Sequence, residues 1–175
     1  MNATEVFFMR DIPYTEAMAI TTERLTRGGA FLTVGGHTPN TMTIGWGAIG
    51  FFWNRPVFLS VVRPSRHTYD LINQSGTFTV SVPTKNALKA ELAFAGTASG
   101  RDVDKFSGHG LTAAPARMVD APIVAECGLH FECRVRLAQD MTPERMDPDV
   151  IKTAYPRGDL HTMYFGEILA CYETD

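Results

Sequence analysis

The sequence lacks the signals that mark membrane, secreted and nucleic-acid-binding proteins. No apolar run in its 175 residues reaches the length of a membrane span. The first ten residues have neither the basic start nor the long apolar core of a signal peptide. The formal net charge of −3 provides no general attraction to nucleic acid or to an anionic membrane. We therefore expect a cytoplasmic protein with no nucleic-acid partner and no membrane partner.

Cysteines and glycine-rich nucleotide motifs are also scarce. The three cysteines, Cys127, Cys133 and Cys171, include no C-x-x-C pair, which argues against a disulfide framework and a zinc site. We expect them to be buried, reduced thiols. The G-x-G-x-x-G match at Gly45–Gly50 lies within the strand predicted for Thr41–Phe52 and does not open a helix, so nothing indicates a Rossmann site that would hold NAD(P)H permanently. Without repeats or linkers, a chain of this length is expected to form one domain, residues 1–175.

Alternating apolar and polar residues predict a mainly β protein. In Ile123–Leu137 the odd positions are apolar and most even positions are charged, which is typical of one long, half-buried strand. This pattern places Cys127 and Cys133 on the core face and His130 on the solvent face. Further strands are predicted at Ala30–Gly35, Thr41–Phe52, Val57–Arg63, Thr77–Val82 and Thr162–Tyr172, the last apolar on both faces and so expected to be buried on both.

Helices are predicted around these strands. Ala17, Ile20, Arg24 and Leu25 recur at helical spacing within Pro13–Arg27, and glycines follow. Three further helical segments are expected, at Ser65–Ser75 with Ser65 or Thr68 as its cap, at Asn86–Phe94 with Asn86 as its cap, and as one turn at Asp102–Phe106. The short connections favour antiparallel strands in a closed or nearly closed barrel with peripheral helices.

One strand carries a face of small and polar residues. Thr41, Thr43, Gly45 and Gly47 share that face, opposite Met42 and Trp46. Glycines weaken a strand unless something approaches its backbone closely. The face could be the floor for a flat heterocycle that takes hydrogen bonds from backbone N–H groups, or the glycines could only relieve the curvature of a barrel.

Two segments gather cations beside hydroxyls and glycines. Arg63, Arg66, His67 and Thr68 lie where a strand meets a predicted helix N-terminus, which favours anions. Ser99–Lys105 adds Ser99, Arg101 and Lys105. Together they suggest a phosphate site, although the first could be a solvated basic turn. In the second, Asp102 and Asp104 could neutralise Arg101 and Lys105.

The order of these motifs resembles the flavin reductase-like family, and most closely its flavoredoxin branch. The resemblance rests on Asn40-Thr41-Met42-Thr43-x-x-Trp46, on Pro56-x-x-x-Ser60-Val61-x-Arg63-x-x-Arg66-x-Thr68, on Gly96-x-x-Ser99-Gly100-Arg101-Asp102-x-Asp104-Lys105-Phe106 and on His161-x-x-x-Phe165-Gly166-Glu167. It covers the chain from about Gly28 to Tyr172.

The resemblance implies an antiparallel FMN-binding split β-barrel that works as a homodimer. By this likeness, Asn40 and Trp46 line the ring pocket, Arg66 and Thr68 serve the phosphate, and Lys105 and His161 lie near the cofactor. The full set expected to bind FMN is Asn40, Thr41, Met42, Thr43, Trp46, Ser60, Arg63, Arg66, Thr68, Ser99, Arg101, Lys105 and His161. Many relatives carry a cysteine where Phe94 or Ala95 stands here, so no thiol-dependent role is expected at that place.

Two main functions are compatible with this reading. The first is an oxidoreductase that takes electrons from NAD(P)H, bound as a transient substrate, and passes them through FMN to an acceptor. The alternative is a carrier that exchanges electrons with a redox protein partner without oxidising NAD(P)H itself, and a flavin-storage or sensing module is a weaker third. Because the cofactor supplies the chemistry, neither an acid–base dyad nor a covalent nucleophile is expected.

Exposed aromatic residues point to a homodimer. Phe51, Phe52 and Trp53 form an apolar run, and strand 162–172 has more apolar surface than one small barrel can cover. The alternative is that helices of the same chain cover these faces.

Overall fold

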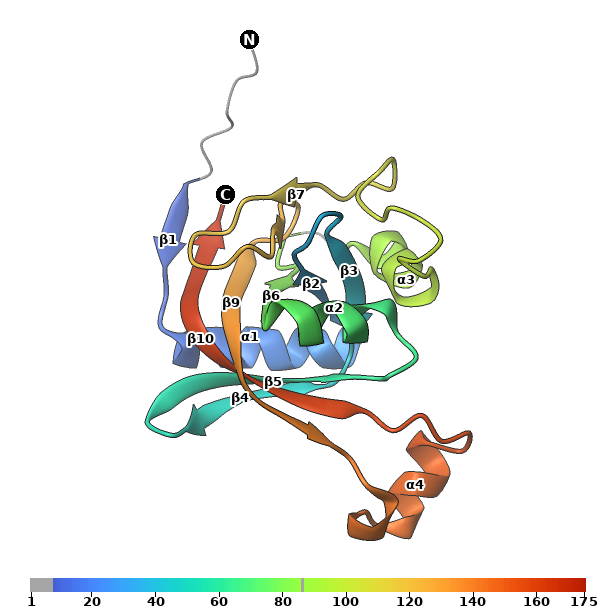
Figure 1. Cartoon of the computed structure of the whole chain (residues 1–175). Helices are drawn as coiled ribbons and strands as arrows, with labels where there is room; N and C mark the ends of the chain where they lie inside the picture. Colours follow the sequence, from blue (N-terminus) through green and yellow to red (C-terminus); the bar gives the residue numbers. More distant parts are fainter. Residues whose placement is uncertain (1–7, 86) are drawn as a thin grey trace.

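The computed structural model describes residues 8–85 and 87–175. These residues include ten strands and four α-helices (Figure 1). In chain order the elements are β1 (Met9–Asp11), α1 (Tyr14–Arg27), β2 (Ala30–Val34), β3 (Asn40–Ile44), β4 (Gly47–Phe52), β5 (Arg55–Val62), α2 (His67–Ser75), β6 (Thr77–Val82), α3 (Lys89–Thr97), β7 (Ala113–Ala114), β8 (Ile123–Val124), β9 (Leu129–Asp140), the 3-10 turn η1 (Pro143–Arg145), α4 (Pro148–Ala154) and β10 (Thr162–Thr174).

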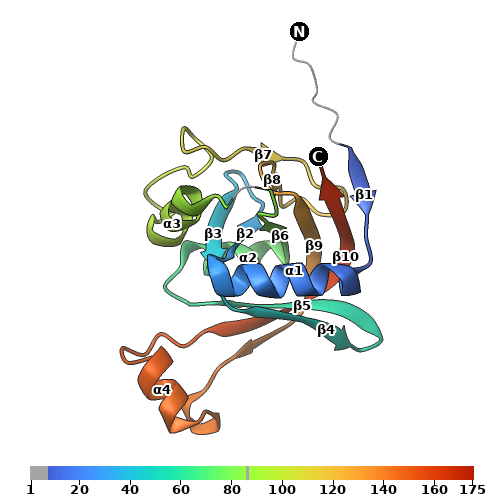
Figure 2. The same cartoon turned by 180° about the vertical axis from the view of Figure 1, so that it is seen from behind.

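The main sheet is antiparallel and bent, as expected for a split barrel. Its strand order is β3-β2-β6-β9-β10-β5-β4, with β1 paired to β10, and each neighbouring pair runs antiparallel. Among the described residues, the hydrogen-bonded ladder stays open between its end strands β3 and β4. Helix α1 packs against β2 and β4 and passes across this side of the sheet (Figure 2). The fold is therefore mainly β with peripheral helices, as predicted.

Aromatic and branched side chains fill the inside of the bent sheet. Phe58 and Phe131 meet edge to face, with ring centroids 5.3 Å apart, and Phe78 and Tyr164 join them in the core. From α1, Ala17, Thr21 and Leu25 are buried at a spacing of four residues, whereas Ile20 is 38% exposed. Residues four apart lie on one face of a helix, which explains why this stripe faces the sheet.

The strand predicted for Thr41–Phe52 is two strands. It breaks at Gly45 and Trp46 into β3 and β4, which are the opposite ends of the sheet. At Gly47, a Cβ atom would come 2.9 Å from the carbonyl oxygen of Leu59, so only glycine fits this approach. The break lets the chain pass from one edge of the sheet to the other, and it leaves Trp46 half exposed in the gap.

The strand predicted for Ile123–Leu137 is also interrupted, and one expectation drawn from it is wrong. Residues 125–128 turn between β8 and β9. Cys127, Cys133 and Cys171 are free and buried, as expected. His130 is fully buried instead of facing solvent, because Ser81, the Cys127 carbonyl and Thr174 surround its ring nitrogens at 3.0–3.1 Å.

Glu132, which follows His130 on the same face of β9, is also fully buried. The alternating pattern therefore assigned this face to solvent incorrectly. The Glu132 carboxylate accepts hydrogen bonds from the backbone N–H groups of Arg117, Met118 and Val119 and from the Tyr172 hydroxyl, at 2.5–3.2 Å. A buried charge is tolerated when it is fully hydrogen-bonded. The 117–119 loop therefore covers what the sequence pattern presents as a solvent face.

Several local predictions about helices need correction. Helix α2 begins at His67, and its N-cap is Arg66 without a side-chain cap hydrogen bond, so neither Ser65 nor Thr68 caps it. Asp102–Phe106 forms turns and not a helix. The cap predicted at Asn86 lies outside the described residues.

In the described part of the chain, no helix is long and apolar enough to cross a membrane.

Strand β10 also differs from the prediction that both of its faces are buried. Buried and half-buried residues alternate along it, so only one face is fully covered. The C-terminal end of β9 extends with η1, α4 and the loop before β10 away from the rest of the sheet, as an arm over residues 136–161 (Figure 1).

Candidate functional site

Two adjoining hollows lie along β3 and share Met42. The first, which we call the Trp46 hollow, has a volume of about 230 Å³ and is lined by Met42, Thr43, Ile44, Gly45, Trp46, Val61, Arg63 and His161. The second, the Arg66 hollow, has a volume of about 60 Å³ and is lined by Asn40, Met42, Ser65, Arg66, His67, Thr68, Thr97, Ala98, Ser99, Gly100 and Lys105. Together they form one elongated site with an apolar, aromatic end and a cationic end.

Strand β3 gives this site a backbone edge. It pairs with β2 on one side and is the terminal strand of the sheet on the other. A terminal strand presents unpaired N–H and C=O groups along its free edge. The Lys105 ammonium group already donates to one of these, the Thr41 carbonyl oxygen, at 2.8 Å.

The cations of the Arg66 hollow lack carboxylate partners. Arg66 donates to the Gly96 carbonyl oxygen at 2.6 Å, and Lys105 donates to the carbonyl oxygens of Thr41 and Ala95 at 2.8 Å each. No carboxylate of the described residues lies within ion-pair distance of either cation. Their charges therefore remain available to an anion.

The pKa values of both cations reflect this arrangement. Burial, and then the charge of Arg63, lower the pKa of Arg66. Burial, and then the charge of Arg66, lower the pKa of Lys105 to about 8. Desolvation and like-charge repulsion both disfavour the protonated forms. A bound anion would relieve the repulsion, so the hollow is electrostatically suited to a phosphate-sized ligand.

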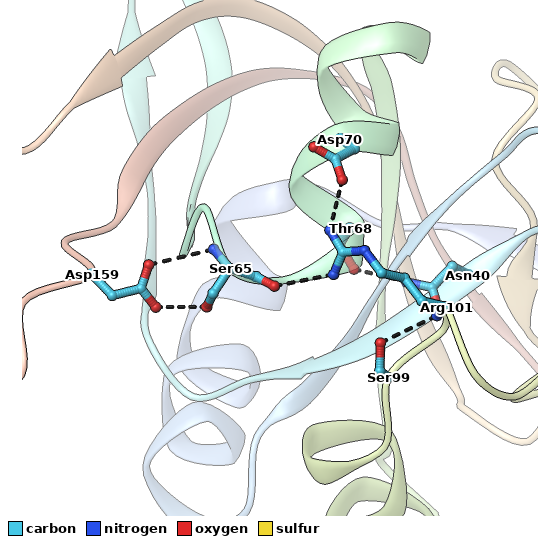
Figure 3. Close-up of polar contacts among 7 residues, drawn as sticks. All are labelled: Asn40, Ser65, Thr68, Asp70, Ser99, Arg101 and Asp159. Carbon is cyan, nitrogen blue, oxygen red and sulfur yellow. Dashed lines mark hydrogen bonds and ion pairs between the residues drawn. The ribbon is translucent and has the colours of Figure 1, made fainter.

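A close packing of Asn40 against Gly100 shapes the same hollow. The Asn40 amide donates to Thr68 Oγ1 at 2.8 Å, at the first turn of α2 (Figure 3). A Cβ atom on residue 100 would lie only 2.0 Å from Asn40 Oδ1, so this position requires glycine. Asn40 is thus held between the loop at Gly100 and the positive end of the α2 dipole.

An ion pair and hydrogen bonds link α2 and Ser65 to two other segments, the 99–101 loop and Asp159. Arg101 pairs with Asp70 at 2.7 Å and also donates to the Ser65 carbonyl oxygen (Figure 3). On the other side, Ser65 Oγ donates to the Asp159 carboxylate at 2.6 Å. Neutralisation of Arg101 therefore comes from Asp70 on α2, and not from Asp102 or Asp104 as the sequence suggested.

Aromatic side chains form the other end of the site. The ring centroids of Trp46 and His161 lie 5.1 Å apart, and Trp46 also contacts Tyr155 edge to face at 6.1 Å. Arg63 lies 5.1 Å from the Tyr155 ring and donates to the carbonyl oxygen of Asp159 at 3.0 Å. These contacts attach the C-terminal end of the arm to Arg63, which follows β5, and close one wall of the Trp46 hollow.

Comparison with known proteins decides the family. The family model of the flavin reductase like domain matches residues 22–175. The chain belongs to the flavin reductase-like family. An uncharacterised protein of Archaeoglobus fulgidus is 36% identical over 140 residues, which cover 79% of this chain and 68% of that protein.

Solved structures place the chain near the flavoredoxin branch of the flavin reductase-like family. The flavoredoxin of Desulfovibrio vulgaris has 27% identity and a TM-score of 0.65, over 84% of this chain and 69% of that one. A flavoredoxin from Methanosarcina acetivorans has 25% identity and a TM-score of 0.65, over 83% and 67% of the two chains.

Most of the residues that the motifs of this family singled out line the two hollows. The residues brought together there are Asn40, Met42, Thr43, Trp46, Arg63, Arg66, Thr68, Ser99, Lys105 and His161. The Thr43 hydroxyl, however, is already used, because it donates to the Leu92 carbonyl oxygen at 2.5 Å.

Three residues of the expected set lie outside both hollows. Thr41 is fully buried and its hydroxyl bonds to Thr33 and the Leu32 carbonyl oxygen. Ser60 is fully buried and shares its strand face with Phe58 and Val62 of the core. Arg101 lies at the rim, in its ion pair with Asp70.

Sequence reasoning missed other lining residues. His67 stood inside the predicted cationic cluster, yet only the structure shows that its Nδ1 is buried without a partner among the described residues. Val61 and Ser60 are neighbours on β5 and point to opposite faces of the strand. The sequence alone did not show which of the two faces lines the site. Tyr155, which contacts Trp46 and His161 but lines neither hollow, comes from the arm, and no local pattern indicates that the arm returns to the site.

Proposed function

We propose that the two hollows hold one FMN, with its ring in the Trp46 hollow and its phosphate in the Arg66 hollow. The single observation that supports this most is the pair of cations, the buried Lys105 and the half-buried Arg66, that lack carboxylate partners beside an aromatic hollow on a free strand edge. FMN carries a phosphomonoester of about −1.5 to −2 charge at neutral pH. The unpartnered Nδ1 of His67 adds a polar atom that a phosphate oxygen could satisfy.

The residues would divide the work by position. Arg66, Lys105 and Thr68 would bind the phosphate, with Arg63 and Ser99 as neighbours. Trp46 and Met42 would pack on the ring, and the N–H groups of β3 would donate to its rim. Bound FMN supplies hydride and electron transfer, while this chain orients the ring and provides the surrounding field.

The activity that we infer is transfer of electrons from reduced nicotinamide to an acceptor. NADH or NADPH would bind transiently at the open side of the Trp46 hollow. Because the cofactor would supply the chemistry, the protein would act by positioning the ring and its substrate. The thiol-dependent role that some relatives suggest has no support, because Phe94 and Ala95 occupy that place.

The second candidate function is that of an electron carrier. It is favoured by the similarity to two flavoredoxins, at 27% and 25% identity. A carrier would bind FMN in the same hollows but exchange electrons with a redox protein and leave NAD(P)H unoxidised.

Anaerobic mixing distinguishes the two candidates. The FMN-loaded protein is mixed with NADH or NADPH without oxygen, and the flavin absorbance is followed. Rapid bleaching is the result expected for the oxidoreductase. Bleaching only by dithionite or by a reduced redox protein would contradict it and favour the carrier.

We also propose that the protein is a homodimer. Phe51, Phe52 and Trp53 are 45–60% exposed, and Phe52 and Trp53 pack on Phe165 with centroids 5.5 and 5.9 Å apart. Phe165 lies on the half-buried face of β10. An aromatic surface of this kind is typical of a subunit interface.

A further inference from the structure

Tyr155 lies behind His161 and was not among the residues expected at the site. It ends α4 as its C-cap, and only 4% of it is exposed. Its hydroxyl oxygen is 2.7 Å from His161 Nδ1. We propose that Tyr155 is a positioning residue that fixes His161 as the neutral tautomer protonated at Nε2, so that this N–H donates to a carbonyl oxygen of a bound flavin ring. The identity of the acceptor rests on the proposed function, whereas the tautomer does not.

Hydrogen-bond chemistry favours this tautomer. A neutral imidazole has one donor nitrogen and one acceptor nitrogen. The Tyr155 hydroxyl can donate to His161 Nδ1 at 2.7 Å or to Met141 Sδ at 3.3 Å. A thioether sulfur is a weak acceptor, and 2.7 Å is shorter than the usual N–H···O separation of about 2.9–3.0 Å. The hydroxyl therefore donates to Nδ1, and the imidazole proton resides on Nε2.

Burial keeps both partners in the required protonation forms. Burial, and then Arg63, lower the pKa of His161 to about 4, against an opposing effect of Asp159. Burial is also the main cause that raises the pKa of Tyr155. Near neutral pH the imidazole is thus uncharged with a free lone pair, and the phenol retains its proton.

The orientation of the ring directs Nε2 toward the ligand. His161 lines the Trp46 hollow, while its Nδ1 is turned to the buried Tyr155. Among the described residues no acceptor is bonded to Nε2. The Met141 N–H donates to the His161 carbonyl oxygen at 3.0 Å, which anchors the backbone beneath the ring. The free donor is therefore presented to whatever occupies the hollow.

Nitrogen-15 NMR of the flavin-free protein tests the tautomer directly. We expect wild-type His161 to show a protonated Nε2 and a non-protonated Nδ1, and Tyr155→Phe to give a mixture of both tautomers. Tyr164→Phe is the matched control, because it removes a hydroxyl that donates to Asn73 at 3.0 Å in the core. A wild-type His161 protonated at Nδ1, or a tautomer unchanged in Tyr155→Phe, would overturn the proposal.

Flavin binding tests the donor role of Nε2. Binding then selects the fraction of His161 that is protonated at Nε2, so an even mixture of tautomers should weaken FMN and riboflavin equally, by about twofold, in Tyr155→Phe and not in Tyr164→Phe. Unchanged affinities in Tyr155→Phe would refute the donor role. If the wild type binds no flavin, the proposed function fails, while the NMR result still decides the positioning of His161.

Discussion

At the residue scale, Arg66 allows the most direct test of the phosphate-binding residues that we propose. A charge-assisted hydrogen bond is worth about 1.5–3 kcal/mol, so Arg66→Ala should weaken FMN binding by roughly ten- to a hundredfold. Riboflavin lacks the phosphate and should bind almost as before. Fluorescence titration of both ligands measures the difference, with Arg27→Ala on the exposed face of α1 as the control.

Equal losses of FMN and riboflavin affinity in Arg66→Ala would contradict a phosphate role. Arg66 also donates to the Gly96 carbonyl oxygen at 2.6 Å, and that contact holds the end of α3. Such a result would mean that the side chain acts through the fold and not through the phosphate.

Lys105 should make FMN binding depend on pH. Its pKa is about 8 in the free protein, and a bound phosphate would raise it, so above pH 8 only the complex retains the proton. FMN affinity should therefore change little between about pH 7 and pH 8 and fall above about pH 8, by up to about tenfold per pH unit. The measurement is the FMN dissociation constant between about pH 7 and pH 9.

Lys105→Met and riboflavin provide the controls for this pH dependence. The variant should bind FMN more weakly at pH 7 and show no fall in affinity above pH 8, because it carries no titrating group. Riboflavin should show no such fall with the wild-type protein. The same slope in wild type and variant would assign the titration to another group.

At the element scale, the 99–101 loop and α2 meet through Asn40. A methyl group at residue 100 would lie 2.0 Å from Asn40 Oδ1 and 3.0 Å from His67 Cδ2. Gly100→Ala should push the loop away from α2, lower the free energy of unfolding by about 1–3 kcal/mol and weaken FMN at least about tenfold. Denaturant unfolding and FMN titration measure the two effects.

Gly50→Ala is the matched control for that change. Its added Cβ would meet the Phe52 ring at an ordinary 3.5 Å, so stability and FMN affinity should change little. Gly100→Ala with wild-type stability and wild-type FMN affinity would show that the loop does not need its close contact with Asn40.

Local patterns predicted the elements better than their interruptions. The bounds predicted for β6, Thr77–Val82, are confirmed, because the alternation that defines a regular strand is visible in the strand's own residues. The breaks at Trp46 and at residues 125–128 depend on where the sheet must open or turn. His130 was misplaced because the hydroxyls of Ser81 on β6 and Thr174 on β10, which contact its ring nitrogens, lie outside its alternating pattern.

The candidate site shows the same division. Clusters that are local in sequence, such as Arg63–Thr68 and Ser99–Lys105, pointed to residues that the fold brings around one hollow. Ser60 was expected beside them, but strand register turns it into the core. Tyr155 contacts His161 through the path of the arm, which is a tertiary feature and has no signature in the sequence.

At the scale of the whole molecule, the aromatic cluster at the β4–β5 turn carries the dimer prediction. Sedimentation at micromolar concentration should give twice the mass of one chain. Trp53→Ser should shift the protein toward monomer, because it removes a half-exposed ring that packs on Phe165. Ile20→Ser, on the outer face of α1, should leave the assembly unchanged.

A monomer mass for the wild-type protein would contradict the dimer. It would also mean that the half-buried face of β10 remains open to solvent in the isolated protein. FMN titration of the monomer would then show whether the residues of one chain that line the two hollows suffice for binding.

In the whole molecule, we propose that one FMN occupies the two adjoining hollows of each chain, with its phosphate against the cations. Calorimetric titration of the flavin-free, wild-type protein with FMN, and then with riboflavin, tests it most directly. We predict one FMN per chain and an affinity at least about tenfold higher than that for riboflavin. No saturable FMN binding, or equal affinity for the two flavins, would contradict the account.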